Sequence, residues 1–254
     1  MSDFKNLSKE DRLVKVCESV LHNEPILIEN LAKGNTNERF YATGKWYDHE
    51  RFALKSFFID KSIKQAKQHF YTCGRLDEFA ITKYDEKILD YGINHLSYAL
   101  LSDNEALIKR YANLRHSNYE AMIKGGGTAP MYILQCIIKD DWREYERVMP
   151  IMKIKTVKKF KMEMDAAYYE ALAERNQSKL EEILSEFVTP NVHKQRNKAH
   201  ELINEFISHP AIGYAKLAWL KGIEVKINSP LVPSDLLPVK PNETYQDDYD
   251  FLKA

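Results

Sequence analysis

The sequence predicts an all-α protein: consecutive antiparallel helical hairpins in one globular domain, followed by a short extended or strand-like C-terminal segment. Three observations support this prediction. From Glu50 onward, apolar residues recur every three to four positions, the period of an amphipathic helix. The 254 residues include only nine glycines and nine prolines, a scarcity that suits long helices. Similar turn sequences return at intervals of about 36 residues, close to the length of one helical hairpin.

The helical period is weakest in residues 1–49, so we expect a less regular N-terminal part there and helical hairpins in residues 50–222. Two long helices should begin the hairpin part, because apolar stripes run through "RFALKSFFIDKSIKQAKQHF" and "EKILDYGINHLSYALL". The first stripe consists of Phe52, Phe57, Ile59, Ile63, Ala66 and Phe70, and the second of Ile88, Leu89, Ile93, Leu96 and Leu100.

Three later turns resemble one another: "LLSDNEALIKRYA", "IIKDDWREYERVM" and "LAERNQSKLEEIL". Each one ends a helix and starts another amphipathic run. A helix start leaves backbone N–H groups unpaired, and the side chain of Asp or Asn accepts a hydrogen bond from one of them. We therefore expect Asp103, Asp140 and Asn176 at helix N-caps, with short connections that make neighbouring helices antiparallel.

The glycine cluster "KGGGTAP" is predicted to be a connection between helices. A phosphate-binding loop would need Gly-Lys-Ser/Thr at the start of a helix, or spaced glycines after a strand. Here Thr128 suits a helix N-cap and Pro130 suits the first turn of the helix that follows. No nucleotide or other cofactor is expected at this loop.

Composition limits the classes of partner. With 37 basic and 37 acidic residues the formal charge is zero, whereas a general nucleic-acid-binding protein carries a basic excess. The basic run "KIKTVKKFK" is followed at once by acidic residues, so we interpret it as a solvated face. No nucleic-acid partner is expected.

Cysteine usage and the N-terminal sequence favour the cytoplasm. Cys17, Cys73 and Cys136 are not clustered, so we expect three small buried side chains and neither a disulfide framework nor a metal site. The charged N-terminus lacks the apolar stretch of a secretory signal, and no run of apolar residues is long enough to span a membrane.

One region could bind a metal ion. His193, His200 and His209 lie near one another in sequence, and Glu205 would share a helix face with His209. However, there is no HExxH motif, and Pro210 is expected to end the helix at His209. We therefore interpret these histidines as surface or capping residues, and expect no catalytic residue, no metal and no cofactor. A metal-dependent enzyme using this region is the alternative.

The C-terminal stretch "GYAKLAWLKGIEVKINSPLVPSDLLP" changes character halfway. Its helical half carries a stripe of small residues that lets another helix approach closely: Ala211, Ala215, Ala218 and Gly222. Trp219 is predicted to lie in the core beside this stripe, and Gly222 just past the helix end. Alternation of Ile223, Val225 and Ile227 with polar residues predicts a short strand. Residues 223–254 should form an extended segment packed on the helices.

The acidic and aromatic tail "NETYQDDYDFLKA" supplies candidate partner contacts. The five candidates are Tyr245, Asp247, Asp248, Tyr249 and Asp250. Aspartates could take the place of nucleic-acid phosphates toward a basic enzyme cleft, and tyrosines could serve as flat anchors. In the alternative interpretation, the aromatic residues of the tail only fasten the chain end to the helices.

The helix "GYAKLAWLKGIEVKI", followed by "SPLVPSDLLP" and a "Y…YDFL" ending, resembles the immunity protein 49 family of bacterial polymorphic toxin systems. It is more distantly similar to nuclease-immunity proteins of the PoNi type. The resemblance implies a helical cytoplasmic protein, not an enzyme, that binds a cognate toxin domain such as a nuclease and occludes its active site. The alternative is a helical-repeat adaptor that joins cellular proteins. No sequence feature selects an oligomeric state.

Overall fold

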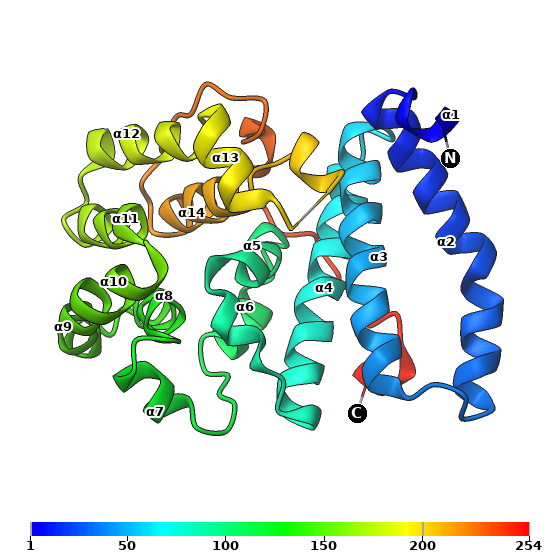
Figure 1. Ribbon diagram of the computed structural model, residues 1–254, viewed down its shortest axis with the longest axis horizontal. Coiled ribbons are helices and arrows are strands. Elements are labelled where there is room, and N and C mark those ends of the chain that lie inside the picture. Colours follow the sequence, from blue (N-terminus) through cyan, green and yellow to red (C-terminus); the bar gives the residue numbers. More distant parts are fainter. Residues whose placement is uncertain (1, 200, 254) are drawn as a thin grey trace.

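The computed structural model describes residues 2–199 and 201–253, and every regular element in these two ranges is helical (Figure 1). The all-α prediction is confirmed. The elements in chain order are α1 (Ser2–Lys5), α2 (Lys9–Ala32), α3 (Glu38–Phe58), α4 (Ile63–Tyr84), η1 (Lys87–Tyr91), α5 (Ile93–Leu101), α6 (Glu105–Tyr111), α7 (Tyr119–Lys124), α8 (Ala129–Lys139), α9 (Trp142–Ile151), η2 (Met152–Thr156), α10 (Val157–Phe160), α11 (Glu163–Ala173), α12 (Gln177–Phe187), α13 (Pro190–Asn197), η3 (Ile203–Glu205), α14 (His209–Leu220), η4 (Ser234–Leu236) and η5 (Asp250–Leu252).

The expectation of a less regular N-terminal part is wrong. Helix α2 runs for 24 residues and α3 begins at Glu38. Both have side-chain N-caps, because Ser8 accepts a hydrogen bond from the backbone of Asp11 and Asn37 accepts one from Phe40. The apolar period is weak here because α2 buries only two side chains, Leu13 and Cys17, among the residues described.

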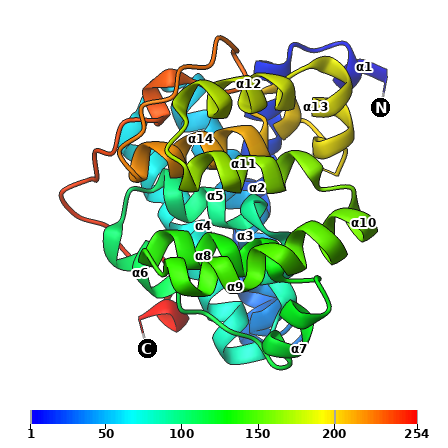
Figure 2. The same ribbon diagram turned by 90° about the vertical axis from the view of Figure 1, so that its left-hand side faces the viewer.

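Long helices occupy one end of the molecule and shorter ones the other (Figures 1 and 2). Helices α2, α3 and α4 lie side by side at the first end, and α8 to α12 form the second. Many neighbours in sequence are neighbours in space, including α3 with α4, α8 with α9 and α11 with α12. Helix α14 departs from that order, because it returns from the C-terminal region to pack on α5 and α12.

Two glycines allow α5 to pack closely against helices on both sides. A Cβ atom at Gly213 of α14 would lie 2.7 Å from Cγ1 of Ile93 and 2.8 Å from Cβ of Ser97. On α4, a Cβ at Gly74 would lie 3.2 Å from Cβ of Ala99. Gly213 lies on the opposite side of α14 from the expected stripe of Ala211, Ala215 and Ala218, so the stripe did not predict this close contact.

The stripe residues Ala211, Ala215 and Ala218 are fully buried, and Gly222 adopts a left-handed φ of +73° after the helix. Trp219 differs from its prediction: it is half-buried at the core's edge, and its Nε1 donates to the Val225 carbonyl over 3.1 Å.

The strand predicted after Gly222 is not present in the described chain, although Ile223 and Val225 are buried. Side chains of α12 pair with this backbone instead of a neighbouring strand. Glu181 accepts from the Lys226 amide over 2.9 Å, and Gln177 donates to the Glu224 carbonyl over 3.1 Å. Alternation of buried and exposed residues thus arises here where irregular chain packs along α12.

The N-cap predicted at Asn176 is correct. At the two other turns, the predicted N-caps Asp103 and Asp140 lie one residue before the residues that cap the helices. The side chains that cap α6 and α9 belong to Asn104 and Asp141. Asp103 and Asp140, directly before them, adopt left-handed backbone conformations with φ of 60° and 57°. Asp tolerates this conformation better than most residues, so each turn uses one polar residue to reverse the chain and the next to cap the helix.

The side chain of Asp103 lies in a buried charge cluster. Its carboxylate is 2.7 Å from Nζ of Lys67 on α4 and 2.6 Å from Nζ of Lys216 on α14, and all three side chains are nearly inaccessible. Lys216 also donates to the carbonyls of 236, 237 and 238 over 3.0 Å each. Lys67 donates to the Lys240 carbonyl over 2.5 Å. The cluster therefore fastens the chain after η4 to the helices.

The remaining expectations concern the loop before α8, the cysteines and membrane spans. Thr128 is the N-cap residue of α8 and Pro130 lies in its first turn, as predicted. All three cysteines are buried and free, also as predicted. Within the described ranges, no helix combines the length and the apolar character needed to cross a membrane.

We predict that Gly213→Ala lowers the free energy of unfolding by about 1–3 kcal/mol, because the added methyl group overpacks against α5. The matched control is Gly44→Ala on α3, where a Cβ meets nothing within 4 Å. There the change should be neutral or stabilising by about 0.5–1 kcal/mol, since alanine favours a helix. Chemical denaturation of both variants measures the difference. Equal stabilities would show that α14 and α5 pack less closely than described.

Candidate functional site

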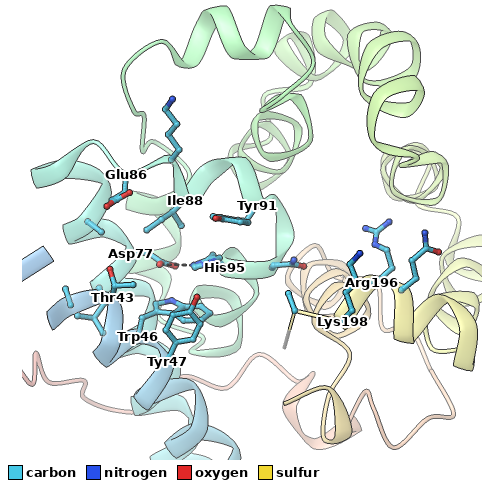
Figure 3. Close-up of a pocket in the computed structure, with 17 residues that line it drawn as sticks. Thr43, Trp46, Tyr47, Asp77, Glu86, Ile88, Tyr91, His95, Arg196 and Lys198 are labelled. Carbon is cyan, nitrogen blue, oxygen red and sulfur yellow. Dashed lines mark hydrogen bonds and ion pairs between the residues drawn. The ribbon is translucent and has the colours of Figure 1, made fainter. Parts of the chain in front are cut away.

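A cavity of about 530 Å³ lies between α3, α4, η1, α5 and α13 (Figure 3). This volume is within the range of sites that bind small molecules or partner side chains. Aromatic side chains from α3, η1 and α5 gather on one side, and polar side chains from α13 lie across from them (Figure 3).

His95 is held in place inside the cavity wall. Its ring stacks on Trp46, with centroids 4.2 Å apart, and on Tyr91 at 5.1 Å. Its Nδ1 lies 3.0 Å from Oδ1 of Asp77, and Tyr111 donates to the second oxygen of Asp77 over 3.3 Å. In the neutral imidazole, a carboxylate at Nδ1 favours a proton there and leaves Nε2 as an acceptor.

Exposed aromatic side chains border the cavity. Tyr47 and Tyr91 line it and are 46% and 63% exposed. Phe40 and Thr43 continue the face of α3 on which Tyr47 lies, because the intervals of three and four residues place all three on one side of a helix. Phe40 is 68% exposed.

The opposite wall is fixed by an ion pair between a partly buried arginine and a buried aspartate. Arg196 of α13 donates two hydrogen bonds to Asp165 of α11, over 2.8 and 2.7 Å. Asp165 also accepts from Tyr214 of α14 over 2.6 Å. Because both of its oxygens are bonded, Asp165 holds the α13 wall of the cavity against α11 and α14.

The residues suggested for metal binding lie apart. His193 contacts the Asn204 carbonyl over 2.8 Å, and Glu205 pairs with Arg12 at 2.5 Å. His200 lies outside the described residues. In the parts of the chain that are described, no three metal-ligating side chains come together.

His209 and Pro210 differ from their predicted roles. Pro210 lies in the first turn of α14, so the helix begins at His209 instead of ending there. Proline suits the first turn because its missing N–H has no helical partner in that position. His209 is fully buried, within hydrogen-bonding distance of Tyr98 and 3.2 Å from Glu50. It is therefore neither a surface nor a C-terminal capping residue.

The tail lies against α3 and α4. Tyr245 donates to the Ser102 carbonyl, and Asp247 accepts hydrogen bonds from Arg75 at 2.9 Å and Tyr71 at 3.0 Å. Tyr245 and Asp247 are thus engaged within the chain.

The rest of the tail divides into bonded and exposed residues. Asp248 accepts from Thr72 over 2.8 Å, and the Tyr249 hydroxyl lies 2.8 Å from Nε2 of His49. Asp250 is different: its side chain is 98% exposed and pairs only locally, with Lys253 at 2.7 Å. The structure therefore bonds Tyr245, Asp247, Asp248 and Tyr249 to the helices, although Asp248 is itself exposed, and leaves Asp250 in solvent.

Sequence reasoning missed the residues that receive the tail. Gln68, Tyr71, Thr72 and Arg75 contact it from α4. Their spacing of three, one and three places them on one helix face, a polar stripe that the sequence contains. That stripe is a signal for a docked segment, although it does not say which segment docks.

Comparison with known proteins decides the family. The family described as immunity protein 49 matches residues 60–236, more than half of the chain. The chain belongs to the immunity protein 49 family. No curated protein and no solved structure gives a significant match.

The immunity protein 49 match covers α4 through η4 and therefore most of the cavity wall. The exposed stripe of α3 and the tail beyond η4 lie outside the matched residues. The predicted resemblance to this family is confirmed. The more distant similarity to PoNi proteins stays a prediction.

We predict that the His49 contact makes the protein less stable in mild acid. Burial lowers the pKa of His49 to about 3, and the nearby His69 and Lys45 add to the shift. Because the unfolded chain takes up the proton near pH 6.5, the unfolded state binds more protons below that pH. Stability is therefore lost as the pH falls from about 6.5 toward 3.

Between pH 7 and pH 5 the His49 contribution amounts to a loss of about 2 kcal/mol. His49→Gln keeps a polar partner for Tyr249 and removes the titrating group. Denaturant unfolding at both pH values should show the variant losing about 2 kcal/mol less than the parent. Equal losses would mean that His49 takes up its proton without unfolding.

Proposed function

We propose that the chain is an immunity protein that binds a cognate antibacterial toxin in the cytoplasm and neutralises it by occluding its active site, without catalysing a reaction. The toxin is of a kind that acts in the cytoplasm, such as a nuclease. The observation that carries this proposal is the immunity protein 49 match over residues 60–236. The name of that family describes an immunity function, and an immunity protein needs a toxin to bind.

The packing of the chain supports inhibition by binding. A rigid surface loses little conformational entropy when it binds, so more of the interaction energy appears as affinity. Here α5 lies in close contact with α4 and α14, and the chain after η4 is fastened by Lys67 and Lys216. The arrangement favours a preformed binding surface over a segment that folds on contact.

The proposed role of the tail in binding depends chiefly on Asp250. Asp247 accepts hydrogen bonds from Arg75 and Tyr71, so a partner would have to displace these side chains to reach it. Asp248 is exposed, but one of its oxygens already accepts a hydrogen bond from Thr72. Among the described residues, Asp250 forms an ion pair with Lys253, and this pair is exposed. An exposed pair of this kind is weak, so a partner can replace Lys253 easily. A toxin cleft with basic residues could therefore use Asp250 first.

Co-expression with a candidate cognate toxin domain tests the function. We expect cells that carry both proteins to grow, and cells with the toxin domain alone to stop growing. Purified chain and an inactivated toxin domain should bind in a fixed stoichiometric ratio in calorimetry, since occlusion requires one binding site per active site. Growth arrest in the presence of the chain, or protection without binding, would contradict the proposal.

Two charge reversals separate a tail that binds the toxin from one that only anchors the chain end. Asp250→Lys should leave thermal stability unchanged, and should weaken toxin binding if Asp250 faces a basic cleft. Asp247→Lys should instead destabilise the protein, because it places a second cation beside Arg75. Unchanged binding by Asp250→Lys in calorimetry would show that the tail serves only as an anchor.

A further inference from the structure

The face of α3 and η1 beside the cavity has the composition of a protein-binding surface. Phe40, Tyr47 and Tyr91 are 68%, 46% and 63% exposed, although large aromatic side chains are usually more buried. Aromatic residues are enriched at protein interfaces and supply much of the binding energy there. We call the surface formed by Phe40, Thr43, Tyr47 and Tyr91 the aromatic face.

The aromatic face opens into a cavity with a rigid floor. Tyr47 and Tyr91 line the cavity of about 530 Å³, and the stacked rings of Trp46 and His95 form part of its wall (Figure 3). Asp77 fixes His95 with a 3.0 Å hydrogen bond. A preformed cavity beside exposed aromatic residues can receive a bulky side chain of a partner, which is how interface hot spots pair.

The charges around the cavity favour an acidic partner. Glu86 pairs with Arg39, Arg196 pairs with Asp165, and Asp77 bonds His95, so these charges are already compensated. Two exposed lysines that line the cavity, Lys87 and Lys198, make no ion pair with the residues described. Lys87 helps to lower the pKa of Asp85, so its charge is partly compensated. The charged residues that line the cavity are two acidic and three basic, which leaves an excess of one positive charge.

We propose that the aromatic face and its cavity dock the toxin domain, through a toxin segment that inserts an apolar or aromatic side chain flanked by carboxylates. This proposal rests on the proposed function and adds the binding face and the chemistry of the partner. The inserted side chain contacts Tyr47 and Tyr91, and the flanking carboxylates approach Lys87 and Lys198.

Gly44 offers a substitution that tests the face without disturbing the fold. It lies on α3 between Phe40 and Tyr47, and a Cβ there meets nothing within 4 Å. Gly44→Arg places a long charged side chain across the aromatic face, and should weaken binding to the inactivated toxin domain about 100-fold or more. Gly44→Ala is the matched control and should bind like the parent.

A second pair compares two equally exposed apolar residues. Phe40 on the aromatic face and Ile154 on the far π-helical turn are both 68% exposed. Phe40→Ala should weaken binding about ten-fold or more, whereas Ile154→Ala should leave it unchanged. Circular dichroism and thermal unfolding establish that all four variants remain folded.

Charge reversal tests the acidic character of the partner. Lys87→Glu and Lys198→Glu should slow association and make binding less sensitive to salt, because they remove the attraction that salt screens. Lys158→Glu, on α10, is the matched control and should change neither. Unchanged association rates and salt dependence in all three variants would overturn the proposal that the partner is acidic.

Hydrogen exchange of the complex locates the interface independently. We expect slower exchange in the parts of α3 and η1 that carry the aromatic face. Slower exchange confined to the exposed apolar end of α2, at Leu21, Ile26 and Ile28, or confined to α9 and α10, would overturn the proposed face. Binding of the toxin domain by Gly44→Arg and Phe40→Ala at parental affinity would also overturn the proposed face. If the parent chain itself fails to bind the toxin domain, the proposed function fails, and the assignment of this face fails with it.

Discussion

The arrangement of the C-terminal half depends on the ion pairs of one buried carboxylate, that of Asp103. It lies between two buried ammonium groups, Lys67 at 2.7 Å and Lys216 at 2.6 Å. Burial lowers the pKa of Lys216 to about 8, although Asp103 opposes the shift. Removing one member of such a cluster leaves a buried charge uncompensated, which typically costs about 3–5 kcal/mol. Because the lysines also bond the carbonyls that follow η4, the same cluster fixes α4, α14 and the chain leading to the tail.

A second buried group, the hydroxyl of Tyr98, positions helices that surround the cavity. Tyr98 on α5 hydrogen-bonds Glu50 on α3 and His209 on α14, so its hydroxyl joins the three helices in the centre of the molecule. Asp165 does the same for α11, α13 and α14 through Arg196 and Tyr214. The cavity lies between these two groups of helices, and its walls are therefore positioned by hydrogen bonds that are buried at Tyr98 and partly buried at Arg196.

Sequence patterns predicted those features of the fold that depend on residues close together in the chain. The 3.6-residue period predicted the helical fold, and the alanines of the stripe predicted on α14 are buried. Contacts between distant residues were missed. Asp103 was expected at a cap because the local turn contains two polar residues, and its actual partner Lys216 is 113 positions away in the chain. The strand prediction failed for a related reason: alternation shows which side is buried, but not whether the neighbour is a strand or the side chains of α12. The cavity likewise combines residues from α3 and α13 that no local motif relates.

Helix α3 connects the anchored tail with the exposed aromatic face. One side of α3 carries Tyr41 and His49, which contact Tyr249 of the tail at ring-centroid distances of 5.9 and 5.7 Å. Another side carries Phe40 and Tyr47, which are exposed. A docked tail therefore restrains the helix that presents the proposed binding residues, even though several tail side chains are themselves hydrogen-bonded to α3 and α4. Restraint of this kind lowers the entropy lost on binding, so the tail can raise affinity for a toxin from a position behind the interface.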